Sequence, residues 1–245
     1  MGRDKLGSRL GFILLSAGCA IGIGNVWKFP YIVGQSGGGL FVLIYLFFLL
    51  ILGIPVLTME FSIGRAAQKS PAKMYEQLEP KGSKWHLHGK VSLIGSYLLM
   101  MFYTTVAGWM LKFFVSTASG ELVGMDTAAV GKHFNVDVLG DPVSLIGYMA
   151  IVVVIGVLVC FIGVQNGLEK VTKVMMIALL AIMVVLAINS FTLPGGAEGL
   201  AFYLLPDFSA IEKVGITNIL VSAMNQAFFT LSIGMGCMAI FGSYI

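Results

Sequence analysis

The amino-acid sequence contains six long stretches that are almost free of charge, interrupted only by Glu60 and Lys112. A helix needs about 20 residues to cross the roughly 30 Å hydrocarbon core of a bilayer, and each stretch has a suitable length. The stretches are too long for barrel strands and lack alternation with a period of two, so they predict an all-α membrane bundle. They are Leu10–Trp27, Gly38–Ile63, Val91–Thr117, Val143–Ile162, Val174–Thr192 and Val214–Ser243.

Composition supports a membrane protein and excludes several other classes. Hydrophobic residues make up 58% of the chain and charged residues 11%, whereas soluble domains have about 45–50% and about 25%. These values argue against a disordered chain, a nucleic-acid binder and almost any soluble enzyme. Cys19, Cys160 and Cys237 each lie in an apolar stretch and share no metal-ligand spacing. We interpret them as small buried hydrophobic residues, with no disulfide framework.

The distribution of basic residues predicts the orientation in the membrane. With a cytoplasmic N-terminus, eleven of the fifteen Lys and Arg residues fall inside, as the positive-inside rule requires. The basic inner loop includes a predicted short interfacial helix at Pro71–Leu78. We therefore expect a multi-pass protein of the plasma or inner cell membrane. Its expected segments are a cytoplasmic N-terminal segment (1–9), five spans (10–192), an extracellular loop (193–213) and a sixth span (214–245).

Two of the predicted spans carry features that disfavour a continuous helix. The first contains Gly18, Gly22 and Gly24 followed by Asn25, and the sixth contains the small-residue segment Ser232–Gly236. Each glycine inside a helix costs about 1 kcal/mol relative to alanine. One interpretation is close helix packing, because Gly18 and Gly22 fit a G-x-x-x-G pattern. The other is an unwound ligand-binding segment, and two such breaks separated by four uninterrupted spans favour it.

Glu60 is the one acid well inside a predicted span. An ionisable residue at this depth marks a functional site by default. Two roles remain open for Glu60. It is either a structural hydrogen-bond partner, which its place near the cytoplasmic end of the span favours, or a residue that couples ion binding to transport.

Several sequence motifs follow one another along the chain: Ser8–Gly11, Gly22–Tyr31, Gly37–Phe41, Gly53–Pro55, Glu60 with Gly64 and Arg65, and Gln226–Ser232. Their order resembles the neurotransmitter:sodium symporter family, particularly its bacterial amino-acid transporters. The resemblance covers essentially the whole chain. It implies a LeuT-type inverted-repeat fold, with the first five-helix repeat and the first helix of the second, and with helices 1 and 6 unwound in mid-membrane.

The resemblance also implies a substrate site. Backbone amides freed at the first break and the Tyr103 hydroxyl would bind a carboxylate, and carbonyls at both breaks would accept from an ammonium. Monoamine transporters of the family carry an aspartate at the position of Gly22, so glycine favours an amino acid. Apolar side chains around the site favour a neutral hydrophobic or aromatic one. The implied substrate-binding residues are Ala20, Gly22, Ile23, Gly24, Leu99, Tyr103, Phe229, Thr230, Ser232 and Met235.

Ions and gates follow from the same resemblance. One sodium ion would be bound by Ala20, Asn25 and Thr230, and a second by the carbonyls of Gly18 and Ile21. A region similar to the family's chloride site contains Tyr45, Gln226 and Thr230, and the use of chloride stays open. The implied gating residues are Arg3, Lys28, Tyr103 and Phe229. Lys28 departs from the arginine usual in the family, which lysine replaces without its bidentate fork.

The resemblance implies sodium-coupled symport of a neutral hydrophobic or aromatic amino acid by alternating access. The alternative is a non-transporting binding or regulatory membrane protein built on half of the fold. A channel would need a continuous polar lining across several spans, and an enzyme would need a nucleophile–base pair, neither of which the sequence shows. The implied partners are the amino-acid substrate, the lipid bilayer and the second-repeat helices from helix 7 onward. Without those helices we expect the 245 residues not to perform coupled uptake alone.

Overall fold

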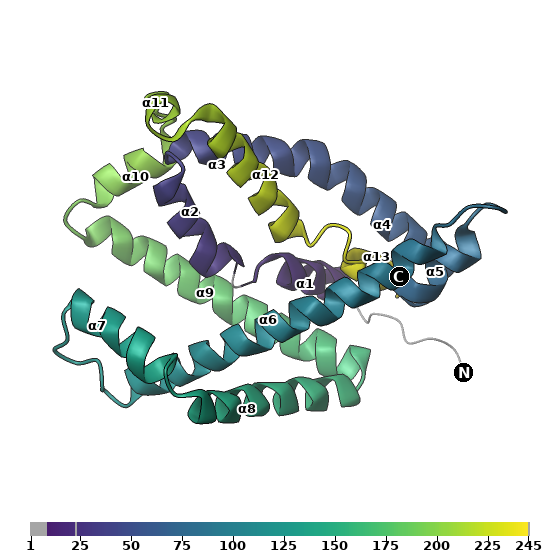
Figure 1. The fold of residues 1–245 in the computed structure, drawn as a ribbon, viewed down its shortest axis with the longest axis horizontal. Coiled ribbons are helices and arrows are strands. Elements are labelled where there is room, and N and C mark those ends of the chain that lie inside the picture. Colours follow the sequence, from purple (N-terminus) through teal and green to yellow (C-terminus); the bar gives the residue numbers. More distant parts are fainter. Residues whose placement is uncertain (1–8, 23, 245) are drawn as a thin grey trace. The chain divides into compact units, whose positions relative to one another are not determined.

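The structure is a computed structural model that describes residues 9–22 and 24–244. The chain divides into two compact units, one formed by residues up to Ser92 and from Glu169 onward, the other by Leu93–Leu168. Helices dominate both units (Figure 1). Helices of the first unit are α1 (Arg9–Ala20), η1 (Gly24–Lys28), α2 (Phe29–Gln35), α3 (Gly39–Phe48), η2 (Leu49–Gly53), α4 (Ile54–Ala67), α5 (Pro71–Leu78), α9 (Lys170–Thr192), α10 (Gly196–Leu204), α11 (Ala210–Val214), α12 (Ile216–Leu231) and α13 (Cys237–Gly242).

The second unit contains the rest of the helices. Two of them begin or end in the first unit, because α6 and η4 cross the boundaries at Ser92 and Glu169. The helices concerned are α6 (His86–Ala118), α7 (Thr127–His133), η3 (Phe134–Val138), α8 (Pro142–Phe161) and η4 (Val164–Glu169).

Helix length and apolarity agree with a membrane protein. Among the described residues, four helices are long and apolar enough to cross a bilayer, and the bent pair Arg9–Ala20 and Gly24–Gln35 makes a fifth if it is one span. The 16-residue helix α12 is apolar but shorter, and α13 follows it after a break. The first and sixth predicted stretches are therefore the interrupted ones, as expected. The predicted helix Pro71–Leu78 is also present, as α5.

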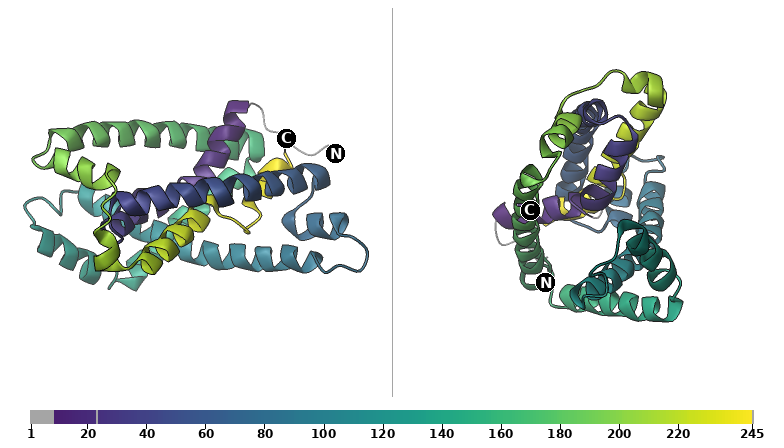
Figure 2. Two further views of the ribbon diagram at one scale, coloured as in Figure 1. Left: turned by 90° about the horizontal axis from the view of Figure 1, so that it is seen from above. Right: turned by 90° about the vertical axis from the view of Figure 1, so that its left-hand side faces the viewer.

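A π-helical turn keeps α3 and α4 in one continuous span, Gly39–Ala67. Pro55 follows this turn in the first turn of α4, where its missing N–H is tolerated because the wider turn absorbs the lost hydrogen bond. In the left view of Figure 2, α3 and α4 follow one another end to end in the same direction. A Cβ on Gly53 would lie 2.6 Å from Leu231 Cδ1, so glycine lets α12 approach this span closely.

The core of the first unit is formed where α12 packs against α3. Phe41 and Ile219 are fully buried there, and the rings of Phe41 and Tyr45 stack with centroids 6.3 Å apart. A second cluster joins α13 to α4 and α5 through Ala239, Ala67 and Met74. Together these two clusters fix both halves of the sixth span on α3 and α4.

Capping residues start two helices of the second unit, α7 and α8. Asp126 accepts a hydrogen bond from the Ala129 N–H at 2.7 Å and begins α7, and Asp141 accepts one from the Ser144 N–H at 3.1 Å and begins α8. Both are standard N-cap contacts. The hydrogen bond from Ser144, and then Lys112, hold the pKa of Asp141 below its usual value.

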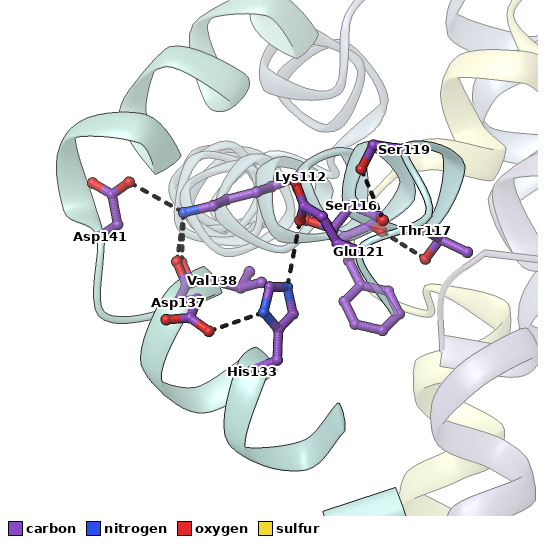
Figure 3. A network of polar contacts seen from close by, with 10 residues as sticks. Lys112, Ser116, Thr117, Ser119, Glu121, His133, Asp137, Val138 and Asp141 are labelled. Carbon is purple, nitrogen blue, oxygen red and sulfur yellow. Dashed lines mark hydrogen bonds and ion pairs between the residues drawn. The ribbon is translucent and has the colours of Figure 1, made fainter. Parts of the chain in front are cut away.

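Lys112 connects the C-terminal part of α6 to the segment before α8. Its Nζ donates to the Asp137 carbonyl at 2.7 Å and to Asp141 Oδ2 at 3.3 Å (Figure 3). In the same network His133 Nδ1 lies 2.9 Å from Asp137 Oδ2 and Nε2 lies 4.0 Å from Glu121 Oε2. The segment between α6 and α8 thus contains the short helices α7 and η3 and is held by this network.

Two further expectations need correction or refinement. The segment 193–213, predicted as a loop, contains α10 and most of α11, because its Gly-rich start is followed by a helix-forming run from Gly196 to Leu204. Cys160 is exposed rather than buried. It lies on α8, which has no buried residue, so an apolar sequence there does not mean protein packing.

Candidate functional site

The first break separates α1 from η1 within the first predicted span. Helix α1 ends at Ala20, and the chain turns through Ile21 and Gly22. The Gly22 carbonyl then accepts from the Asn25 N–H at 3.0 Å and the Val26 N–H at 3.3 Å. A Cβ on Gly22 would meet no atom within 4 Å. Space therefore remains next to the break, on the side where a side chain would project.

The second break separates α12 from α13 and is held by contacts from two other helices. Ser232 ends α12 with φ +50°, and Gly234 and Gly236 have φ +82° and +75°, a conformation that glycine adopts without strain. Glu60 Oε1 on α4 accepts the Gly234 N–H at 2.9 Å. The Ser92 hydroxyl on α6 donates to the Met235 carbonyl at 2.7 Å. No motif in the sequence indicates the Ser92 contact, which joins residues far apart in the chain.

A polar network connects the two breaks. Asn25 Nδ2 donates to the Ala20 carbonyl at 2.6 Å, and its Oδ1 accepts the Thr230 hydroxyl at 2.8 Å. The Tyr45 hydroxyl donates in turn to Thr230 Oγ1 at 3.0 Å. Gln226 Nε2 donates to the Gly24 carbonyl at 3.3 Å. Oxygen atoms from both interrupted helices thus converge around one asparagine side chain.

Two predicted gating residues lie next to each other. Lys28 Nζ lies 5.0 Å from the centroid of the Phe229 ring, within the range of a cation–π interaction. The same ring packs directly against Gly24, where a Cβ would overlap it. Phe229 thus lies against the first and last residues of η1, Gly24 and Lys28. The family resemblance implied Lys28 and Phe229 as gating residues but not this contact between them.

A cavity of about 430 Å³, lined by polar and apolar residues, opens beside Lys28 and Phe229, between α2 and α12. Lys28 is the one cation among its lining residues. The cavity is therefore suited to a ligand with both polar and apolar parts. Its lining residues are Lys28, Ile32, Gln35, Ser36, Ser222, Asn225, Gln226 and Phe229.

The structure brings together some predicted site residues and leaves others untested. Ala20, Asn25 and Thr230, expected to share a sodium ion, are linked by hydrogen bonds. Gly18 and Ile21 lie at the end of α1, and Gly18 faces Thr172 and Met176 of α9. Leu99 and Tyr103 lie on the part of α6 in the second unit. Arg3 and Ile23 lie outside the described residues.

Comparison with known proteins agrees with a transporter architecture built around two broken helices. The profile of the sodium:neurotransmitter symporter family matches residues 3–137 and 129–245. The chain belongs to this family, which consists of symporters rather than enzymes. In the solved structure described as MhsT in complex with L-phenylalanine, 38% of aligned residues are identical and the TM-score is 0.87. The match covers 99% of this chain and 54% of that one, which establishes the LeuT-type fold predicted from the sequence.

Curated relatives give the same picture. An uncharacterized sodium-dependent transporter of Bacillus subtilis, YhdH, is 38% identical over 97% of this chain and 51% of its own length. The sodium- and chloride-dependent taurine transporter of the dog is 28% identical over 99% of this chain and 44% of its own length. The chain thus spans about half the length of the curated relatives it matches. The family supports a membrane location and the use of sodium.

Proposed function

We propose that this chain provides substrate- and sodium-binding elements of a symporter for a neutral hydrophobic or aromatic amino acid that works by alternating access. The observation that carries the proposal is the convergence of oxygen atoms from both broken helices on Asn25. Such atoms suit a hard cation and a charged amino-acid backbone. The similarity to MhsT, whose structure contains L-phenylalanine, supports the substrate class.

The first sodium site is proposed at Ala20, Asn25 and Thr230. The Ala20 carbonyl, Asn25 Oδ1 and Thr230 Oγ1 are joined by hydrogen bonds of 2.6 and 2.8 Å through Asn25. A sodium ion bound there would replace these hydrogen bonds with direct oxygen coordination. Tyr45, which donates to Thr230 Oγ1, would continue to orient the threonine hydroxyl. The second site is proposed at the Gly18 and Ile21 carbonyls.

The substrate is proposed to bind at the first break, with its carboxylate at the amides that follow Gly22. The open space at Gly22 supports this position, because a carboxylate can approach the backbone where no side chain stands. Phe229 and Met235 supply apolar surface from the other broken helix. By resemblance, Leu99 and Tyr103 complete the pocket, and Tyr103 and Arg3 act with Lys28 and Phe229 in gating.

The test is equilibrium binding of radiolabelled L-phenylalanine to the complete polypeptide that carries residues 1–245, in sodium and in choline buffer. We expect saturable binding in sodium only. Thr230→Val should weaken sodium activation, because it removes one ligand and leaves the Tyr45 hydroxyl without its acceptor, at about 1–3 kcal/mol or roughly 5–150-fold. Thr230→Ser keeps the hydroxyl and is the matched control. Equal sodium affinity in both variants would refute the proposed site.

Two further measurements separate the parts of the proposal. Gly22→Asp should abolish amino-acid binding, since the new carboxylate would occupy the space proposed for that of the substrate, and unchanged affinity would contradict this position. Uptake into proteoliposomes driven by a sodium gradient distinguishes a transporter from a non-transporting binding protein. Replacing chloride with gluconate in the same assay tests whether the Tyr45 and Gln226 region serves a chloride ion.

A further inference from the structure

The segment that contains α5 connects two membrane spans at one surface of the bilayer. The span Gly39–Ala67 ends just before this segment, and α6, which is also long enough to cross a bilayer, begins at His86 just after it. Helix α5 packs on α4, and a Cβ on Gly89 of α6 would lie 2.5 Å from the Pro71 carbonyl oxygen of α5 (Figure 1). The distribution of basic residues predicts that this surface is the cytoplasmic one.

An apolar pocket opens beside α5. Met74 of this helix is fully buried, and Ile63 and Tyr75 pack against its cluster. Next to them lies a cavity of about 270 Å³, slightly smaller than the roughly 300–1,000 Å³ of sites for drug-sized ligands. Leu78 and Trp85 in its wall are 42% and 59% exposed, so this wall can be reached from the membrane surface. The lining residues are Ile63, Tyr75, Leu78, Glu79, Pro80 and Trp85.

A turn at the edge of the pocket carries two exposed lysines. The Pro80 carbonyl accepts the Ser83 N–H at 3.1 Å, the hydrogen bond that closes a β-turn. Lys81 directly follows Pro80, and Lys84 directly precedes Trp85, so each lysine is next to a lining residue. Both lysines are exposed. Positive charge therefore lies at the edge of an apolar pocket.

Glu79, the acid among the lining residues, is held by contacts inside the loop. Its Oε2 accepts the backbone N–H of His86 at 3.0 Å, its Oε1 lies 3.0 Å from His86 Nδ1, and the Ser83 hydroxyl donates to Oε2 at 3.3 Å. From Arg65 to Lys90 the sequence has six Lys and Arg residues and two acids. The charge around the pocket therefore suits an anion.

We propose that this pocket binds an anionic phospholipid of the cytoplasmic leaflet, with part of an acyl chain against Leu78 and Trp85 and the headgroup phosphate next to Lys81 and Lys84. Tryptophan and tyrosine are enriched at membrane interfaces, and basic segments close to the membrane attract the anionic lipids of this leaflet. A phospholipid joins an apolar chain to a phosphate, which matches an apolar wall beside two cations. The site depends on the membrane location and not on the proposed transport function.

Quenching of Trp85 fluorescence by brominated lipids tests the site. The complete polypeptide that carries residues 1–245 is reconstituted into phosphatidylcholine vesicles that contain an equal fraction of either dibrominated phosphatidylglycerol or dibrominated phosphatidylcholine. The signal of Trp85 is the difference between the parent and Trp85→Phe, and it reports contact with the brominated acyl chain. We expect phosphatidylglycerol to bind at least about fivefold more tightly than phosphatidylcholine, the factor that one lysine near an anionic membrane surface contributes. Equal quenching by the two lipids would overturn the proposal.

Charge-matched variants decide whether the two lysines select the headgroup. Lys81→Gln/Lys84→Gln should lose the preference for phosphatidylglycerol and keep the thermal stability of the parent, because both side chains are exposed. Lys132→Gln/Lys170→Gln removes the same charge from two exposed lysines on α7 and α9 and should keep the preference. A preference that survives in Lys81→Gln/Lys84→Gln, or that falls equally in both double variants, would overturn the proposal.

Helix α5 also contacts the second break, since a Cβ on Gly236 would lie 3.3 Å from Pro71 Cβ. On the proposed function, a lipid that holds α5 in place should therefore strengthen L-phenylalanine binding in the parent and in Lys132→Gln/Lys170→Gln, but not in Lys81→Gln/Lys84→Gln. Lipid selection with unchanged L-phenylalanine binding would refute this coupling. Lipid selection without sodium-dependent binding in any of these proteins would refute the proposed function and leave the lipid site standing.

Discussion

Replacement of Glu60 by methionine tests how the second break is held. Glu60 is only 6% exposed, and its Oε1 accepts the N–H of Gly234 at 2.9 Å. The other carboxyl oxygen, Oε2, is buried without a hydrogen-bond partner. Two opposing effects are therefore present. One oxygen satisfies a buried backbone donor, while the other carries a desolvation penalty.

The sizes of these two effects predict a net loss of stability for Glu60→Met. Methionine has a similar length but cannot replace the carboxyl oxygen, so Gly234 keeps a buried N–H without an acceptor. Such an unsatisfied donor costs about 1–3 kcal/mol, and part of this is returned because the unpartnered Oε2 is removed as well. We expect a net destabilisation of about 1–2 kcal/mol, or a fall in Tm of roughly 2–8 °C for a domain of this size.

Glu60→Gln is the matched variant, because the amide keeps one oxygen for Gly234 and removes the ionisable group. Thermal unfolding in detergent should show Glu60→Gln close to the parent and Glu60→Met clearly below it. Equal Tm values for the two variants would refute the structural role of the carboxyl oxygen. Sodium-dependent binding of L-phenylalanine tests the other role of Glu60. A stable Glu60→Gln protein whose binding no longer depends on sodium would favour the coupling role.

Two more predictions concern the first break and the second unit. Gly24→Ala should weaken L-phenylalanine binding by roughly 5–150-fold, because its Cβ would displace the Phe229 ring and such overpacking costs about 1–3 kcal/mol. Gly147→Ala, where a Cβ meets nothing within 4 Å, is the control. The hydrogen bond from the Ser144 N–H lowers the pKa of Asp141. The Asp141 carboxylate should therefore stabilise α8 fully above the usual aspartate pKa of about 3.9, and this stabilisation should be lost as the pH falls through the lower pKa of the folded state. The protection factor of the Ser144 amide against hydrogen exchange should therefore fall in acid. Asp141→Asn, which caps without titrating, should remove this fall, and a protection factor of the parent that does not change with pH would refute the prediction.

The order of spans and the position of both breaks could be predicted because their causes are local. Long uncharged runs identify membrane helices, and clustered glycines with polar neighbours identify the interruptions. The helix Pro71–Leu78 could likewise be predicted from its own residues. The short helix α7 was missed, although Asp126 provides an N-cap signal, because the polar sequence around it resembles an ordinary loop.

Contacts between distant residues could not be predicted from the residues alone. The Ser92–Met235 hydrogen bond depends on how the helices cross. No periodicity or spacing encodes that crossing. The Asn25–Thr230 contact was expected only through the family resemblance. The positions of Tyr103 and Leu99 relative to the breaks remain predictions, since both lie in the second unit.

Asn25 explains physically why the two breaks would respond to a common ion. Its amide nitrogen bonds across the first break to Ala20, and its oxygen bonds to Thr230 on the other broken helix. On the proposed function, a sodium ion at these oxygens stabilises the backbone geometry at which the substrate carboxylate binds. Linkage then makes the effect reciprocal, so that substrate must raise sodium affinity by the same factor by which sodium raises substrate affinity. Thermodynamic linkage alone requires the two factors to be equal. Their common size measures the strength of the coupling that Asn25 provides between the two breaks.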